Sequence, residues 1–138
     1  MIDFDFLDIP GDDDIGQMIR LYREAGWWGE GPDDPALVKR LVAGSHCVAV
    51  ARREGRIVGM GRAISDRASD AWIQDVTVDA TLRHRGIGSE IVRRLVARLD
   101  ADGMSWIGLV AENGSHPMYE PLGFVAMKNA RPMLRIKG

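Results

Sequence analysis

The junction at residues 78–88 constrains this chain more than any other stretch. It reads Val-Asp-Ala-Thr-Leu-Arg-His-Arg-Gly-Ile-Gly and joins a β-branched run to an amphipathic helical pattern. Gly86 and Gly88 let the backbone approach a ligand closely, so that successive N–H groups can converge on an anion at a helix N-terminus. Arg83 and Arg85 add positive charge beside those donors. The junction therefore predicts a strand, a polyphosphate-binding loop and a helix in succession.

Length and composition limit the organisation of the chain. Its 138 residues, 46% of them hydrophobic, predict a single domain over residues 1–138. A net charge of −2 gives no general attraction to nucleic acid, and no apolar run approaches the roughly 18 residues that span a bilayer. Cys47 is the single cysteine, which excludes an internal disulfide, and no histidine spacing fits a metal site. We therefore expect a cytoplasmic protein with no metal and no nucleic-acid or membrane partner.

Charge is distributed unevenly along the chain. Residues 1–35 hold ten of the 20 acidic residues and only two arginines, whereas residues 83–98 hold five arginines and one glutamate. The acidic part is either a solvated face with acids at helix N-termini or a site for a cation. The second interpretation predicts a protein that binds an anion at one place and a cation at another.

Hydrophobic periodicity predicts alternating strands and helices. Strands are predicted at residues 2–7, 47–51, 56–65, 72–78 and 106–110, the last as a buried parallel strand. Helices are predicted from Asp12, with the aspartates as N-cap, from about Pro35 and after the glycine loop. Residues 116–122 allow one short helix, because Pro121 interrupts it. Residues 124–127 and 133–136 predict a closing hairpin.

A second motif lies downstream, after one predicted helix and one apolar strand. It reads Met-Tyr-Glu-Pro-Leu-Gly-Phe over residues 118–124. Together with Arg-His-Arg-Gly-Ile-Gly at residues 83–88, it resembles the GNAT superfamily of acyl-CoA-dependent N-acetyltransferases, whose loop signature is R/Q-x-x-G-x-G/A. The resemblance extends from about residue 12 to about residue 127. Ala80 departs from it where proline is common, and Asn113 lies one residue closer to Tyr119 than is usual.

The resemblance implies an α/β (α+β) fold with a mixed, mostly antiparallel central sheet that splays between its fourth and fifth strands and is flanked by helices. It also implies acetyl-CoA as co-substrate and direct acetyl transfer to a primary amine, either small or peptidic, in a ternary complex. A homodimer is one option. The alternatives are a catalytically silent acyl-CoA-binding or interaction module and, less well supported, a nucleotide-binding protein, for which no Gly-x-x-x-x-Gly-Lys-Ser/Thr sequence is present.

By this resemblance, one set of residues binds the cofactor. The backbone of the fourth strand pairs with the pantetheine arm, the loop receives the pyrophosphate, and Asn113 positions the cofactor or the acetyl group. The residues concerned in the strand and the loop are Val76, Thr77, Val78, Arg83, His84, Arg85, Gly86, Ile87, Gly88 and Ser89.

A second set of residues is expected to perform the chemistry. By the resemblance, Tyr119 is the general acid at the sulfur, and a phenol with a pKa of about 10 can protonate a thiolate as its charge develops. Packing of Tyr119 against Phe124 is the structural alternative. The general base is open between Asp75, Glu112 and a water chain. Acceptor binding is expected in the loop after the first helix, through Glu24, Trp27, Trp28 and Glu30, which favours a cationic, partly apolar amine; the tryptophans could instead pack the loop or a dimer interface.

Overall fold

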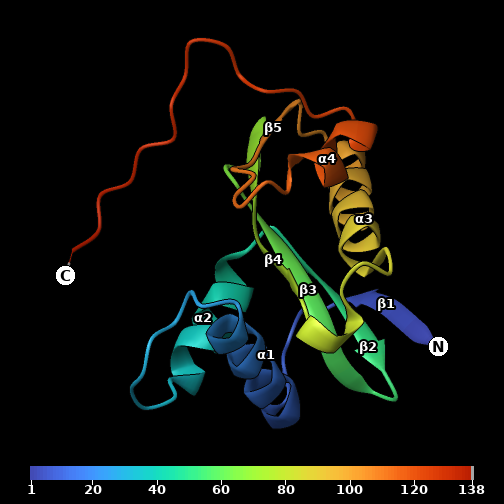
Figure 1. Cartoon of the computed structure of the whole chain (residues 1–138), viewed down its shortest axis with the longest axis vertical. Helices are drawn as coiled ribbons and strands as arrows, with labels where there is room; N and C mark the ends of the chain where they lie inside the picture. The colour runs from blue at the N-terminus through green and yellow to red at the C-terminus, as the bar shows by residue number, and fades with distance from the viewer. Residues whose placement is uncertain (138) are drawn as a thin grey trace.

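A five-stranded sheet forms the centre of the computed structural model, which describes residues 1–137 (Figure 1). The strand order follows the sequence: β1 (Ile2–Phe6), β2 (Cys47–Arg53), β3 (Arg56–Ser65), β4 (Asp70–Val78) and β5 (Trp106–Gly108). Neighbouring strands are antiparallel except β4 and β5, which are parallel. The helices are α1 (Asp12–Glu24), α2 (Pro35–Gly44), α3 (Ile87–Ala101) and α4 (His116–Tyr119). This confirms the predicted fold class.

Helices cover both faces of the sheet (Figure 1). Alternate residues of β2 enter different cores: Ala49 and Ala51 pack in the cluster with α3, whereas Val48 and Val50 pack in the cluster with α1 and α2. This is the period of two expected for a strand buried on both faces. The apolar positions that recur at helical spacing in α3, Ile91, Val92, Leu95 and Leu99, are buried, and Val96 is half-buried.

Two glycines of β3 set the height of α3 above the sheet. A Cβ atom at Gly61 would lie 2.9 Å from Ile91, and one at Gly59 would lie 3.1 Å from the same side chain. A methyl group at either position would force the Ile91 side chain to shift. The helix that follows the phosphate-binding loop is therefore held close against β3.

Strands β4 and β5 separate after a short paired stretch. Their pairs are Asp70 with Trp106, Ala71 with Ile107, and Trp72 with Gly108. Beyond these pairs β4 continues to Val78 with its β5-side edge unpaired, as predicted for a splayed sheet. The rings of the two tryptophans meet edge to face over Gly108 at 5.4 Å, where any side chain would collide with them.

The pairing of β3 with β4 is interrupted within β4. The register shifts between Met60 and Arg62, and Asp75 has φ of +59°. A non-glycine residue with this backbone conformation in a strand marks a β-bulge. The bulge lies on the part of β4 that has no β5 partner.

Several sequence predictions need correction. No strand forms at residues 124–127 or 133–136, within an extended segment from residue 124 to 137. Two four-residue strands bury too little surface to persist as an isolated hairpin. The N-cap of α1 is Gly11, whose N–H donates to Asp14, rather than an aspartate. The strand predicted at 106–110 ends at Gly108. Among residues 1–137, no helix is long and apolar enough to cross a membrane.

Candidate active site

A groove of about 1000 Å³ follows the unpaired edge of β4. Its walls come from β4, the loop before α3, the segment after β5, and α4. It brings together most of the residues that the sequence singled out: Trp27, Asp75, Val76, Thr77, Val78, Arg83, His84, Gly86, Ile87, Gly88, Ser89, Asn113 and Tyr119. Motifs far apart in the sequence therefore border one cavity.

One end of the groove is built around the N-terminus of α3. Gly86 caps this helix in the left-handed region, with φ of +81°, and a Cβ there would meet nothing within 4 Å. Conformation, rather than lack of space, therefore requires glycine at this position. The N–H groups of the first turn have no carbonyl within the helix to bond, and the helix dipole adds partial positive charge. Gly88 has a different role, since a Cβ there would lie 3.3 Å from Met118 of α4.

The basic residues of the loop divide between two cavities. The exposed Arg83 lines the groove, and its Nε donates to the carbonyl of Val78 at 3.2 Å. His84 also lines the groove and has φ of +64°. Arg85 instead borders a separate cavity of about 200 Å³, together with Arg53 and the N-terminal residues. The loop thus presents Arg83, but not Arg85, to the groove.

Asp75 is held at the centre of the groove by two donors. Tyr22 of α1 donates its hydroxyl to the carboxylate at 2.8 Å, and Arg62 of β3 donates from Nε at 2.6 Å. Burial and the nearby charge of Asp75 raise the pKa of the Tyr22 phenol. Trp28 stacks on the Tyr22 ring at 4.1 Å between centroids. These contacts connect α1, β3 and the bulge of β4.

Tyr119 lies at the end of α4, on the opposite wall. Its side chain is 8% exposed and meets the ring of Phe124 edge to face at 6.0 Å. Burial and, secondarily, the charge of Glu112 raise the pKa of the phenol. The hydroxyl therefore remains protonated at neutral pH. The brevity of α4, four residues before a 3₁₀ turn at Glu120–Leu122, agrees with the effect expected of Pro121.

Comparison with known proteins identifies the family. A model of the acetyltransferase (GNAT) family matches residues 15–124. This chain belongs to the GNAT acetyltransferase family. The resemblance proposed from the loop and the downstream motif is thereby confirmed.

Curated relatives match parts of this GNAT chain. It is 37% identical over 75 residues to GCN5-related N-acetyltransferase 2, chloroplastic, of Arabidopsis thaliana, covering 54% of this chain and 29% of that protein. It is 30% identical over 128 residues to histone acetyltransferase TAP1 of Glycine max, covering 84% of this chain and 54% of that protein. The chain thus spans about half or less of the length of these relatives.

A solved structure extends the likeness to the whole fold. The probable acetyltransferase SA2161 of meticillin-resistant Staphylococcus aureus superposes with a TM-score of 0.81 at 21% identity, with all of both chains covered. At this identity the comparison supports the GNAT fold, with the mixed sheet described above.

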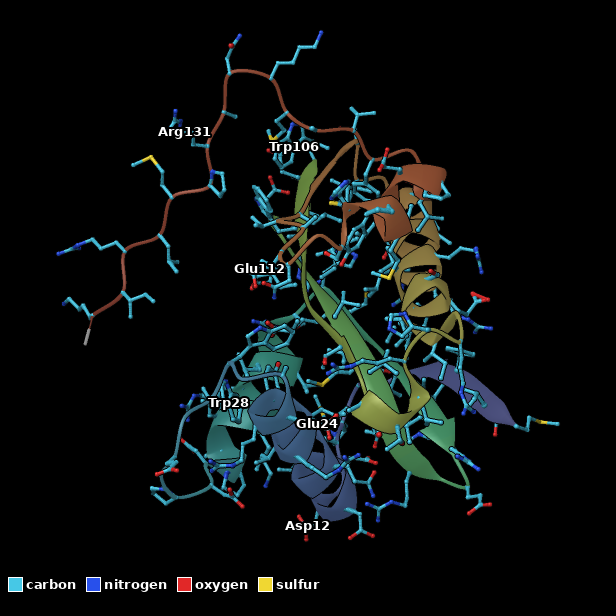
Figure 2. All side chains as sticks on the ribbon, in the orientation of Figure 1. Asp12, Glu24, Trp28, Trp106, Glu112 and Arg131 are labelled. Carbon is cyan, nitrogen blue, oxygen red and sulfur yellow. The ribbon has the colours of Figure 1, made fainter. Side chains whose placement is uncertain are left out.

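The acceptor residues expected from the sequence do not all face the groove of this GNAT domain. Trp27 lines it and is 42% exposed. Glu24 instead accepts from the N–H of Ala80 at 2.7 Å, and Trp28 is stacked on Tyr22. Glu30 is exposed and lies outside the groove lining. In Figure 2, Glu24 and Trp28 lie beside α1 and α2, well below Glu112.

Several groove residues were missed by sequence reasoning. Trp72 and Gln74 line the groove from β4. Glu112, which the sequence suggested only as a general base, lines the groove from the segment after β5. Trp72 and Gln74 alternate with the buried Ala71 and Ile73, so the period of two in this strand could have placed them on the open face. Pro132, Met133 and Leu134 also border the groove, and no sequence signal connects this segment with β4.

Proposed function

We propose that this protein transfers an acetyl group from acetyl-CoA to a primary amine by direct attack in a ternary complex. The observation that carries the proposal is the layout of the groove: a helix N-terminus for an anion at one end, a buried phenol on the other wall, and an unpaired strand edge between them. The GNAT family generally uses acetyl-CoA.

The residues present fit the cofactor along its length. The edge of β4 that has no β5 partner, formed by the backbone of Val76 to Val78 with Thr77 between them, can pair with an extended pantetheine arm as an added strand would, and the carbonyl of Val78 there also accepts from Arg83. The pyrophosphate would lie at the start of α3, where Gly86 is open to solvent and Arg83 and His84 line the wall. Ile87, Gly88 and Ser89 supply N–H groups of the first turn, and Asn113 lines the cavity beyond. Arg85 contributes charge only from the adjoining cavity.

The proposed chemistry uses groups on both walls. Acetyl-CoA supplies the activated acyl carbonyl. A backbone N–H at the β4 bulge can donate to the oxygen of that carbonyl. Tyr119 donates a proton to the departing sulfur, and its raised pKa keeps that proton in place beforehand.

The amine must lose protons during the transfer. A primary ammonium with a pKa of about 10.4 is neutral only about once in 2,500 at pH 7, which costs about 4.6 kcal/mol. Asp75 is the proposed acceptor of a proton, directly or through water, because it lines the groove beside the unpaired edge. Its Oδ2 accepts both hydrogen bonds found within residues 1–137, so Oδ1 is the oxygen that we propose accepts the proton. Glu112, on the facing wall, is the alternative base.

The composition of the acceptor end favours a cationic amine with an apolar body. Glu112 and Asp75, the latter paired with Arg62, are the acidic residues there, while Trp27 and Trp72 supply exposed aromatic surface. Aromatic rings and carboxylates together favour an ammonium group on an apolar carrier. Both a small amine and a peptide amine meet this description.

Two measurements test the proposal. Acetyl-CoA should raise the melting temperature, whereas ATP and NAD should not, and free CoA should appear when small amines and lysine peptides are added. Stabilisation without CoA release across the panel would indicate the catalytically silent acyl-CoA module. Absence of stabilisation would refute the cofactor assignment.

Location and further partners remain predictions. The cytoplasm is expected from the sequence, although the first relative named above is chloroplastic by name. The expectation that the protein binds neither nucleic acid nor membranes is tested by measuring its binding to DNA, RNA and lipid vesicles.

A further inference from the structure

A serine, a histidine and an aspartate are joined by hydrogen bonds at a place outside the groove. The Nδ1 atom of His46 lies 2.6 Å from Oγ of Ser65, and its Nε2 atom lies 2.8 Å from Oδ2 of Asp102. Ser65 is the last residue of β3, His46 directly precedes β2, and Asp102 caps the C-terminal end of α3. The same three residue types, bonded in this order, activate the nucleophile of many acyl-transfer enzymes.

The hydrogen-bond partners of His46 assign the position of its proton. Asp102 is ionised at neutral pH, because hydrogen bonds from His46 and from Arg98 keep the pKa of its carboxyl below the usual range. A carboxylate only accepts hydrogen bonds, so Nε2 of His46 is the donor to Asp102. In the neutral ring Nδ1 is then the acceptor, and the hydroxyl of Ser65 donates to it. The two ring nitrogens are exchanged relative to serine proteases, but the roles of base and orienting carboxylate can be the same.

Ser65 is oriented for attack, whereas His46 is shielded from solvent. The side chain of His46 is 5% exposed, and Ser65 is half-buried. The main-chain N–H of Arg67 donates to Oγ of Ser65 at 3.0 Å. With one hydrogen bond donated and one accepted, Oγ keeps a lone pair that has no partner among residues 1–137. That lone pair is available to a carbonyl carbon.

Arg67 places positive charge beside the same residues. Its Nη2 donates to the carbonyl of Ser45, the residue before His46, at 3.2 Å. A cation in this position can stabilise the negative charge that develops on an acyl oxygen during attack by Ser65. Ser65 borders neither of the two cavities described above. Selection therefore depends on reactivity more than on shape, which favours small activated esters.

We propose that Ser65 is an activated nucleophile that takes acyl groups from small activated esters, with His46 as its general base and Asp102 orienting that base. Oγ of Ser65 bonds to the acyl carbon, the bond from that carbon to the ester oxygen breaks, and the serine proton passes through Nδ1 of His46 to the departing alcohol. Water then adds its oxygen to the acyl carbon, and the bond to Oγ breaks. One proton of the water returns through His46 to Ser65, and the carboxylic acid is released.

An alkyl fluorophosphonate tests the nucleophile directly, because an activated hydroxyl forms an O–P bond with it and fluoride leaves. Peptide mapping by mass spectrometry should place one adduct on Ser65, and Ser65→Ala should abolish that adduct. The matched control is Ser69→Ala. Ser69 is the more exposed of the two, but its hydroxyl donates to Asp70 at 2.8 Å, so its loss should leave labelling unchanged. No adduct on Ser65 in the wild-type chain, or equal labelling of Ser65 and Ser69, would overturn the proposal.

Hydrolysis of p-nitrophenyl acetate supplies an independent readout. His46→Gln can still form hydrogen bonds but cannot take the serine proton, so nitrophenolate release that depends on Ser65 should fall about 100-fold or more. Cys47 does not compete for the acyl group, because it is buried and burial raises the pKa of its thiol to about 11. A rate in His46→Gln equal to that of the wild-type chain would reduce the three residues to a structural link between β2, β3 and α3. Both measurements are made without acetyl-CoA, so this proposal and that of acetyl transfer fail separately.

Discussion

The hydroxyl of Tyr22 donates a 2.8 Å hydrogen bond to the carboxylate of Asp75, the residue of β4 with a positive φ. Helix α1 is thereby bonded to the bulge that interrupts pairing between β3 and β4. Arg62 approaches the same oxygen from β3. The conformation of the groove wall thus depends on a helix that contributes little to the groove itself.

Replacing Tyr22 by phenylalanine tests this dependence. The variant keeps the stacking with Trp28 but removes a hydrogen bond to a charged group, so the free energy of unfolding should fall by about 1.5–3 kcal/mol. If the bulge positions the acetyl carbonyl, kcat should fall by about 3- to 10-fold while the Kd for acetyl-CoA stays nearly constant. Calorimetry and steady-state kinetics separate the two effects. A stability loss with unchanged kcat would leave Tyr22 a purely structural residue.

Gly86→Val tests the anion site. Valine is strained at φ of +81°, so the loop should shift and the Kd for acetyl-CoA should rise about tenfold or more. Gly103→Val is the matched control, because Gly103 has φ of +86° and equally open surroundings but lies beyond the C-terminal end of α3. Titration calorimetry should show weaker binding only for the first variant. Equal affinities in both would mean that the pyrophosphate lies elsewhere.

Tyr119→Phe tests general acid catalysis. Packing against Phe124 is retained, so stability and acetyl-CoA affinity should change little, whereas kcat should fall by about 10²-fold if the phenol protonates the sulfur. Any decline of kcat at high pH that arises from this phenol should vanish in the variant. A variant with full kcat on its best amine would assign Tyr119 to packing alone.

Alkaline pH should destabilise the fold. Both tyrosines of the chain have a raised pKa in the folded state, so each binds its proton more tightly there than in the unfolded chain. Their stabilising contribution is complete below pH 10 and is lost as pH rises above it, with a slope of up to about 1.4 kcal/mol per pH unit for each group. Urea unfolding between pH 8 and 11 measures this slope. Tyr22→Phe should make it shallower, beyond the part that Cys47 contributes; an unchanged slope would contradict the assignment.

Glu24→Gln separates the two interpretations of the acidic N-terminal part. In the structure, Glu24 accepts from the N–H of Ala80 and lies 3.4 Å from Arg20, outside the groove lining. We therefore expect a stability loss of about 1 kcal/mol and an unchanged KM for the amine. Thermal unfolding and acceptor kinetics provide the measurements. A raised KM for the amine alone would restore Glu24 to the acceptor site.

The elements that follow from local sequence were predicted well. The alternation in β1, the helical spacing of Ile91 and its neighbours, and the glycine loop each depend on residues close together in the chain. The loop and the motif around Tyr119 then border one groove, as the family resemblance implied.

Features that depend on distant partners were not predicted. Nothing near Asp75 in the sequence indicates that Tyr22, 53 residues earlier, holds its carboxylate. Arg85 borders another cavity, with Arg53 and the N-terminal residues, and nothing in the loop sequence indicates these neighbours. The hairpin predicted after Phe124 does not form, because alternation in two short segments indicates strands but does not provide the neighbouring strand that they need.

The contact of Ile91 with Gly59 and Gly61 has a consequence for variation at a distance. A methyl group added to either glycine would press on α3 and displace its first turn, although neither glycine lines the groove. The affinity for a bound anion would then change because the N-terminus of α3 has moved, although every residue that contacts the anion is unchanged. The size of the side chains at residues 59 and 61 of β3 therefore affects the geometry of a site that neither residue lines.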